Sequence, residues 1–101
     1  MANKEYIDRL KRVILHLHKA DSTWVETVPV HEVFEGQTVW QGDVEVFDLQ
    51  NHPKAKRAYA WSYKTGDDEK FTAIPEVFPV KDALTAVKVS IMAETKKGKR
   101  Q

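Results

Sequence analysis

A histidine and an aspartate are the residues of this chain whose types could do chemistry together. If residues 35–39 form a five-residue turn, the flanking strands pair with His31 opposite Asp43, and Glu45 lies diagonal to the histidine on the same face. A histidine held by a carboxylate can act as a general base, and with a second carboxylate it could bind a metal ion. Such a pair on an exposed sheet is more often a surface ion pair worth less than about 1 kcal/mol. A small enzyme or metal site at His31 and Asp43 is therefore kept as an alternative function.

The remaining histidines and hydroxyl residues add no catalytic pattern. His16 and His18 stand two residues apart in a segment with helical periodicity, so their side chains point in nearly opposite directions and cannot chelate one metal ion. The chain has no Walker loop, no G-x-S-x-G, no H-E-x-x-H and no dinucleotide-binding pattern. We therefore assign no catalytic residue, no metal ligand and no cofactor.

The elements that must position these residues follow from the spacing of apolar side chains. Residues 4–20 and 81–94 carry them at three- and four-residue intervals, which predicts two amphipathic helices. Four segments rich in β-branched and aromatic residues are expected to be strands, at residues 23–34, 39–49, 56–64 and 70–74. Pro29 cannot donate to a ladder, so the first strand should lie at a sheet edge. The order predicts an α+β fold, an antiparallel meander of three or four strands with the N- and C-terminal helices packed on one face.

Strand pairing separates the two faces of this sheet. Placing Asp48 opposite Arg57 sets Val46 opposite Tyr59 and gathers the tryptophans and tyrosines of the second and third strands on one face, namely Trp40, Tyr59, Trp61 and Tyr63. A slip by one residue would mix apolar and polar side chains, so the pattern fixes the parity of the pairing. Aromatic residues on a basic strand can stack single-stranded nucleic acid, but this much apolar area favours a core under the helices.

The opposite face is expected to be open to water. Short side chains there lie beside the ring of Phe47 and would form a shallow apolar groove, with acidic walls made by Asp43 and Glu45. The predicted partner surface consists of His31, Asp43, Glu45, Phe47, Ala58 and Ala60. Such a groove could take a protein partner or a second copy of the chain. The sequence therefore favours a non-enzymatic binding or accessory module that uses the open sheet face.

Opposite charges are concentrated in neighbouring segments. No lysine or arginine occurs between residues 19 and 54, whereas the next segment is cationic at Lys54, Lys56, Arg57 and Lys64. These four residues and the basic end of the chain make nucleic-acid binding the alternative function. Pairing the acidic second strand with the cationic third neutralises much of this charge inside the sheet, as in Asp48 with Arg57. We therefore rank nucleic acid below a protein partner.

Size and composition limit the remaining choices. The chain has 101 residues, a net charge of +1 and no cysteine, which predicts a single domain over residues 1–95 followed by a basic disordered tail over 96–101. The lack of cysteine excludes a disulfide framework and thiolate catalysis and fits a reducing compartment. The sequence shows neither a leader pattern nor an apolar stretch long enough for a membrane span. We expect a soluble, cytoplasmic protein.

The chain resembles known proteins in two respects. The order helix, three strands, helix resembles the double-stranded-RNA-binding domain, but that family begins its second helix with a basic Lys-Lys-x-x-Lys stretch, where this chain has residues 79–83, Pro-Val-Lys-Asp-Ala. The central runs WQGDVEVFDL and HPKAKRAYAW resemble small uncharacterised bacterial proteins of about this length. That second resemblance implies no function and no site residues.

Overall fold

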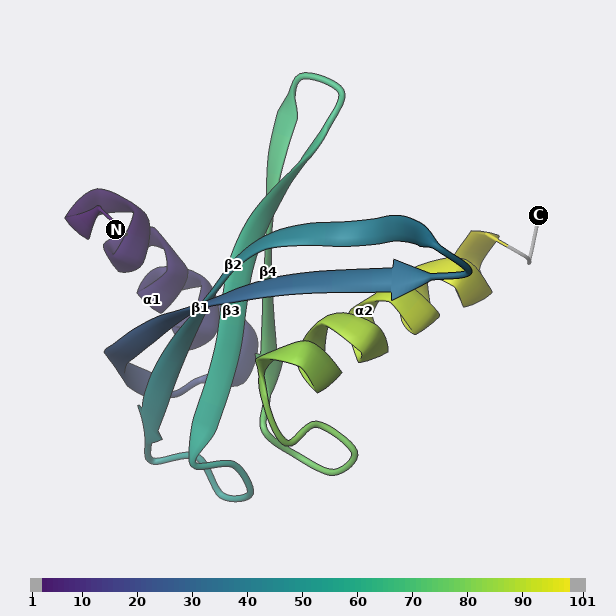
Figure 1. The fold of residues 1–101 in the computed structure, drawn as a ribbon. Helices are drawn as coiled ribbons and strands as arrows, with labels where there is room; N and C mark the ends of the chain where they lie inside the picture. Colours follow the sequence, from purple (N-terminus) through teal and green to yellow (C-terminus); the bar gives the residue numbers. More distant parts are fainter. Residues whose placement is uncertain (1–2, 99–101) are drawn as a thin grey trace.

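The strands of the protein form one antiparallel sheet in the order β1-β2-β3-β4, with one helix before them and one after (Figure 1). The computed structural model describes residues 3–98, with side chains described up to residue 92 except at residue 65. The elements are α1 (Lys4–His18), β1 (Asp21–Phe34), β2 (Gln37–Gln50), β3 (Arg57–Thr65), β4 (Asp68–Pro75) and α2 (Ala83–Gly98). The predicted α+β meander with terminal helices is confirmed.

The expected disordered tail falls partly inside the last helix. Because α2 runs on to Gly98, residues 96–98 are helical. Residues 99–101 of that tail lie outside the described part of the chain.

Both helices begin at capping residues that the sequence supplies. The Asn3 side chain accepts a hydrogen bond from the Tyr6 backbone N–H at 3.1 Å, which satisfies a free donor in the first turn of α1. Asp82 does the same before α2, where its carboxylate accepts the Thr85 N–H at 2.9 Å. That backbone hydrogen bond, together with one from the Thr85 hydroxyl, lowers the pKa of the Asp82 carboxyl below its ordinary value. The caps fix the residue at which each helix begins.

The two helices cover opposite faces of the sheet, so the prediction that they share one face is wrong. Residues of α2 pack on the face that holds Tyr59 and Trp61. Leu10 and Ile14 of α1 pack on the other face, against the side chains of Phe47, Ala58, Ala60 and Ala73. Neighbouring residues of a strand point to opposite faces, and the three alanines leave room for a helix to lie close to the sheet. The result is a sheet with an apolar cluster on each side.

The β2–β3 register is the predicted one, whereas the β1–β2 register differs from the prediction by two residues. Asp48 pairs with Arg57 and Val46 with Tyr59. In the first hairpin, however, His31 lies opposite Gln41 and Asp43 lies opposite Pro29. The main cause is the turn, which has two residues and not five, Glu35 (φ 52°) and Gly36 (φ 77°), as in a type I′ hairpin turn. The shorter turn shifts the pairing by three residues, and the register shift between Glu32 and Val33 restores one of them. From Glu26 to Glu32 the shift is two residues, so the side chains there stay on their predicted faces.

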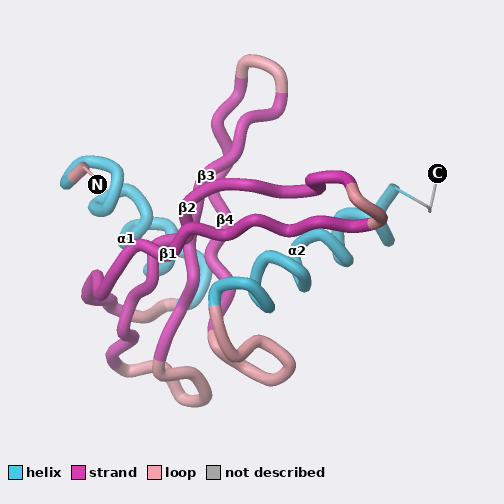
Figure 2. The backbone as a smooth tube through the Cα atoms, viewed as in Figure 1, coloured by secondary structure: helices cyan, strands magenta, loops and turns pink. Residues whose placement is uncertain are grey.

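The two hairpins of the sheet diverge. In the described residues, the β2–β3 ladder covers the four pairs from Glu45↔Ala60 to Asp48↔Arg57, and beyond them β1–β2 and β3–β4 run in different directions (Figures 1 and 2). Trp40 lies edge-to-face with Trp61 near this divergence, at a ring-centroid distance of 5.7 Å. Gly42 makes room for the Trp40 ring, because a Cβ atom at that position would lie 3.2 Å from the ring carbon Cη2.

Candidate binding surface

The expected open sheet face is covered by α1. Among its predicted site residues, Glu45 is 2% exposed and the other three on β2 and β3 are 0% exposed, namely Phe47, Ala58 and Ala60. These four residues therefore belong to the interior and cannot form the walls or floor of a surface groove. His31 and Asp43 do remain exposed.

Glu45 is a carboxylate held inside the fold by neighbouring side chains. Its Oε1 atom accepts hydrogen bonds from Trp24 Nε1 at 2.9 Å and from Thr27 Oγ1 at 2.6 Å. The register brings Thr27 directly opposite Glu45 on the neighbouring strand. Since a buried carboxylate is costly unless it accepts hydrogen bonds, the two donors stabilise it there. Glu45 thus ties β1 to β2.

The pair predicted for chemistry is not formed as expected. His31 Nε2 is hydrogen-bonded to Thr38 Oγ1 at 2.7 Å, on the same hairpin. Asp43 lines a small hollow with His31, of about 190 Å³, but the two residues are not opposite each other in the ladder. In residues whose side chains are described, no three His, Asp or Glu residues form a group that could hold a metal ion. The structure offers no geometric support for a general base there.

The cations proposed for nucleic-acid binding are spread along the molecule. Arg57 Nε lies 3.1 Å from Asp48 Oδ1, which confirms that predicted pair. Lys54 and Lys56 are exposed in the loop before β3, whereas Lys64 is exposed near the other end of that strand. From Arg57 to Lys64 an extended strand spans roughly 23 Å at about 3.3 Å per residue. Nucleic-acid binding by these residues stays a prediction.

An apolar groove that the sequence did not reveal lies between the tip of the first hairpin and α2. This hairpin groove has a volume of about 680 Å³ and is lined by Glu32, Val33, Phe34, Val39, Lys88, Ile91 and Met92. Phe34 is 64% exposed and Met92 61% exposed. Figure 1 shows the hairpin extending alongside α2. The groove thus joins side chains that are more than fifty residues apart in the chain.

A β-bulge helps to form the hairpin groove. The β1–β2 register shifts between Glu32 and Val33, so Val39 is an extra residue between the partners Trp40 and Thr38. A bulge re-aims the side chain of the extra residue and increases the local twist. Lys88 Nζ lies 3.8 Å from Glu32 Oε2, so the two charges of the groove face each other. The remaining lining is apolar.

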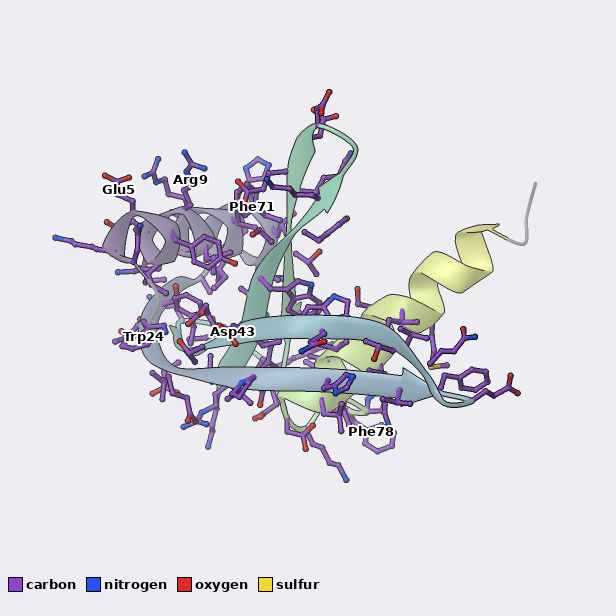
Figure 3. All side chains as sticks on the ribbon, turned by 45° about the horizontal axis from the view of Figure 1, so that its top comes forward. Glu5, Arg9, Trp24, Asp43, Phe71 and Phe78 are labelled. Atoms are coloured by element: carbon purple, nitrogen blue, oxygen red, sulfur yellow. The ribbon has the colours of Figure 1, made fainter. Side chains whose placement is uncertain are left out.

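A second exposed apolar feature lies in the loop between β4 and α2. Phe78 is 95% exposed and projects from the molecule (Figure 3). The same loop is tied to the sheet through Tyr59, whose hydroxyl donates a hydrogen bond to the Glu76 carboxylate. Burial, and then this hydrogen bond, raise the pKa of the Tyr59 hydroxyl well above its ordinary value of 10.0.

The raised pKa of Tyr59 predicts a loss of stability in alkali. Above pH 10 the unfolded chain releases the Tyr59 proton while the folded protein keeps it, so the free energy of unfolding falls with pH, by up to about 1.4 kcal/mol per pH unit for one proton. Urea unfolding between pH 8 and 11 should show this slope, and Tyr59→Phe should reduce it by the contribution of one proton. An unchanged slope in Tyr59→Phe would contradict the assignment.

Comparisons with protein-family models, curated proteins and solved structures found no match to this chain. In the described part of the chain, neither helix has the length and apolar character needed to span a bilayer. The function must therefore be argued from the surface itself.

Proposed function

We propose that this chain is a non-enzymatic binding module, and that its hairpin groove takes the apolar side of an amphipathic helix from a partner protein. The observation that carries the proposal is the groove itself, in which Phe34 and Met92 are more than half exposed. Contiguous exposed apolar surface of this kind typically marks an interaction site. Its volume of about 680 Å³ gives room for apolar side chains of the kind that a helix presents at three- and four-residue spacing.

The charges of the hairpin groove indicate how a partner is recognised. Its acid and its cation, Glu32 and Lys88, lie 3.8 Å apart and offset each other. The groove therefore offers no excess charge, and the free energy of binding comes from apolar burial. Binding should then depend weakly on salt, in contrast to phosphate recognition by lysines and arginines, which weakens steeply as salt rises.

A displayed library of amphipathic helical peptides tests the proposal. Peptides selected on the wild-type protein should bind Phe34→Ser at least about tenfold more weakly, because an exposed aromatic anchor typically contributes more than 1 kcal/mol. Leu17→Ser is the matched control, since Leu17 is 53% exposed on α1 and does not line the groove. Both variants should keep the wild-type melting temperature.

Two results would overturn this function. The first is that the library yields no peptide that binds the wild-type protein. The second is that the selected peptides bind Phe34→Ser as tightly as they bind Leu17→Ser, which would place their site outside the hairpin groove.

A further inference from the structure

The outer edge of the sheet at β1 is blocked against pairing with another strand. Pro29 lies in the middle of this strand, opposite Asp43. Proline has no N–H to donate, and natural sheets use it to protect exposed edges. The β1 edge is therefore a poor template for a further strand.

Side chains of α1 meet the free backbone groups of β3 and β4. Beyond the short β2–β3 ladder, the Ser62 N–H of β3 donates to the Tyr6 hydroxyl oxygen at 2.9 Å. On the outer edge of β4, the Ala73 carbonyl oxygen lies 2.8 Å from His18 Nε2. The helix thus supplies hydrogen-bond partners where a strand would otherwise be needed.

The free edge of β2 has no such protection. Leu49 N–H donates to Lys56 O toward β3. In an antiparallel ladder, the backbone groups of every second residue point to the same edge of the strand. Gln41 and Asp43 therefore point their N–H and C=O groups to the edge that Leu49 uses, the one that faces β3. At these two residues the described part of the chain supplies no strand partner on that side. Residues 36–42 contain no proline, lysine or other charged residue, so this segment lacks the proline and the charges that protect many edge strands.

We propose that a second copy of this chain pairs with the free edge of β2. The two β2 strands run antiparallel about a two-fold axis near Gly42, so that Gln41 of each copy lies opposite Asp43 of the other. This isologous arrangement satisfies the same backbone groups in both copies. It also brings no two acids opposite each other.

Three observations favour a second copy as the occupant. The segment is uncharged from residue 36 to 42, so two identical strands can approach without repulsion. The first hairpin projects away from the β3–β4 hairpin (Figure 1), and the β2–β3 ladder ends at Glu45↔Ala60. A ladder of a few residues buries little area, and the exposed side chains of Val33 and Val39 at the hairpin tip, 47% and 46% exposed, add apolar surface to it.

The oligomeric state tests this pairing. We expect the mass measured by light scattering after gel filtration to rise from one chain to two as the protein concentration increases from about 10 µM to about 1 mM. Gln41→Pro removes an outward N–H and should stay monomeric, whereas Gln41→Thr keeps the N–H and should still dimerise. Met92→Ser in the hairpin groove should leave the dimer unchanged, so failure of this proposal and failure of the groove proposal are distinguishable.

Amide hydrogen exchange of the wild-type protein provides a second test that needs no folded proline variant. The N–H groups of Gln41 and Asp43 should exchange slowly at the high concentration and faster at the low one. A monomer at every concentration overturns the proposal. The candidate occupant of the free edge would then be an extended segment of another protein. A dimer in which these two amides exchange rapidly, or a dimeric Gln41→Pro, also overturns it.

Discussion

Replacing Phe47 with alanine is expected to lower the free energy of unfolding by about 3–5 kcal/mol, because the whole ring lies in the interior and its removal leaves a cavity. Phe47 is 0% exposed, and it packs with Leu10 and Ile14 of α1 on the face that the sequence suggested was open. If that face were solvated, the loss of the ring would change stability very little. The substitution therefore decides where α1 lies.

Urea or thermal unfolding measures this effect. Val39→Ala on the same strand is the matched control, since Val39 is 46% exposed and should cost less than about 1 kcal/mol. A destabilisation by Phe47→Ala no larger than that of the control would contradict the position of α1.

Trp61→Ala is expected to cost a similar amount, about 3–5 kcal/mol, on the other side of the sheet. Trp61 is 2% exposed and packs against α2 residues. Its loss also removes the edge-to-face partner of Trp40, at 5.7 Å. A melting curve identical to that of the wild type would show that this face is not a core.

A double-mutant cycle isolates the contact between the two rings. Trp40→Ala, Trp61→Ala and the double variant should give a coupling energy of about 0.5–1.5 kcal/mol, the range of aromatic pairs in contact. Additive effects of the two substitutions would mean that the rings stabilise the fold independently.

The strands and their faces could be predicted because alternation of side chains is a strong constraint. The opposite charges of Asp48 and Arg57 and the shared face of Val46 and Tyr59 both point to one register, and the structure has it. In the first hairpin the parity held from Glu26 to Glu32, where the predicted register was wrong by two residues. Pro29 likewise identified β1 as an edge strand.

The position of α1 could not be predicted from the same signals. An amphipathic pattern shows that a helix has an apolar side, but it does not tell which face of a sheet will receive that side. Ala58 and Ala60 were interpreted as the floor of a surface groove because they are small. Their size instead allows α1 to approach the sheet closely, and both are 0% exposed.

The first turn and the hairpin groove were missed for two different reasons. Glu35 adopts a positive φ of 52°, a conformation that is uncommon for residues other than glycine, asparagine and aspartate. Glu-Gly is therefore a weak signal for a two-residue turn. The hairpin groove depends on Phe34, Val39 and Met92 lining the same hollow although they are far apart in the chain, and no local pattern in the sequence reports such an arrangement.

The sheet order has a consequence for how fast this domain can reach its native state. Each strand pairs with the next one along the chain, so the ladders close short loops and lose little chain entropy. Docking of α1 joins residues much farther apart, as in the Tyr6 to Ser62 hydrogen bond, which spans 56 residues. We therefore expect the rate of folding to be limited by the return of α1 to the sheet, after both hairpins have formed.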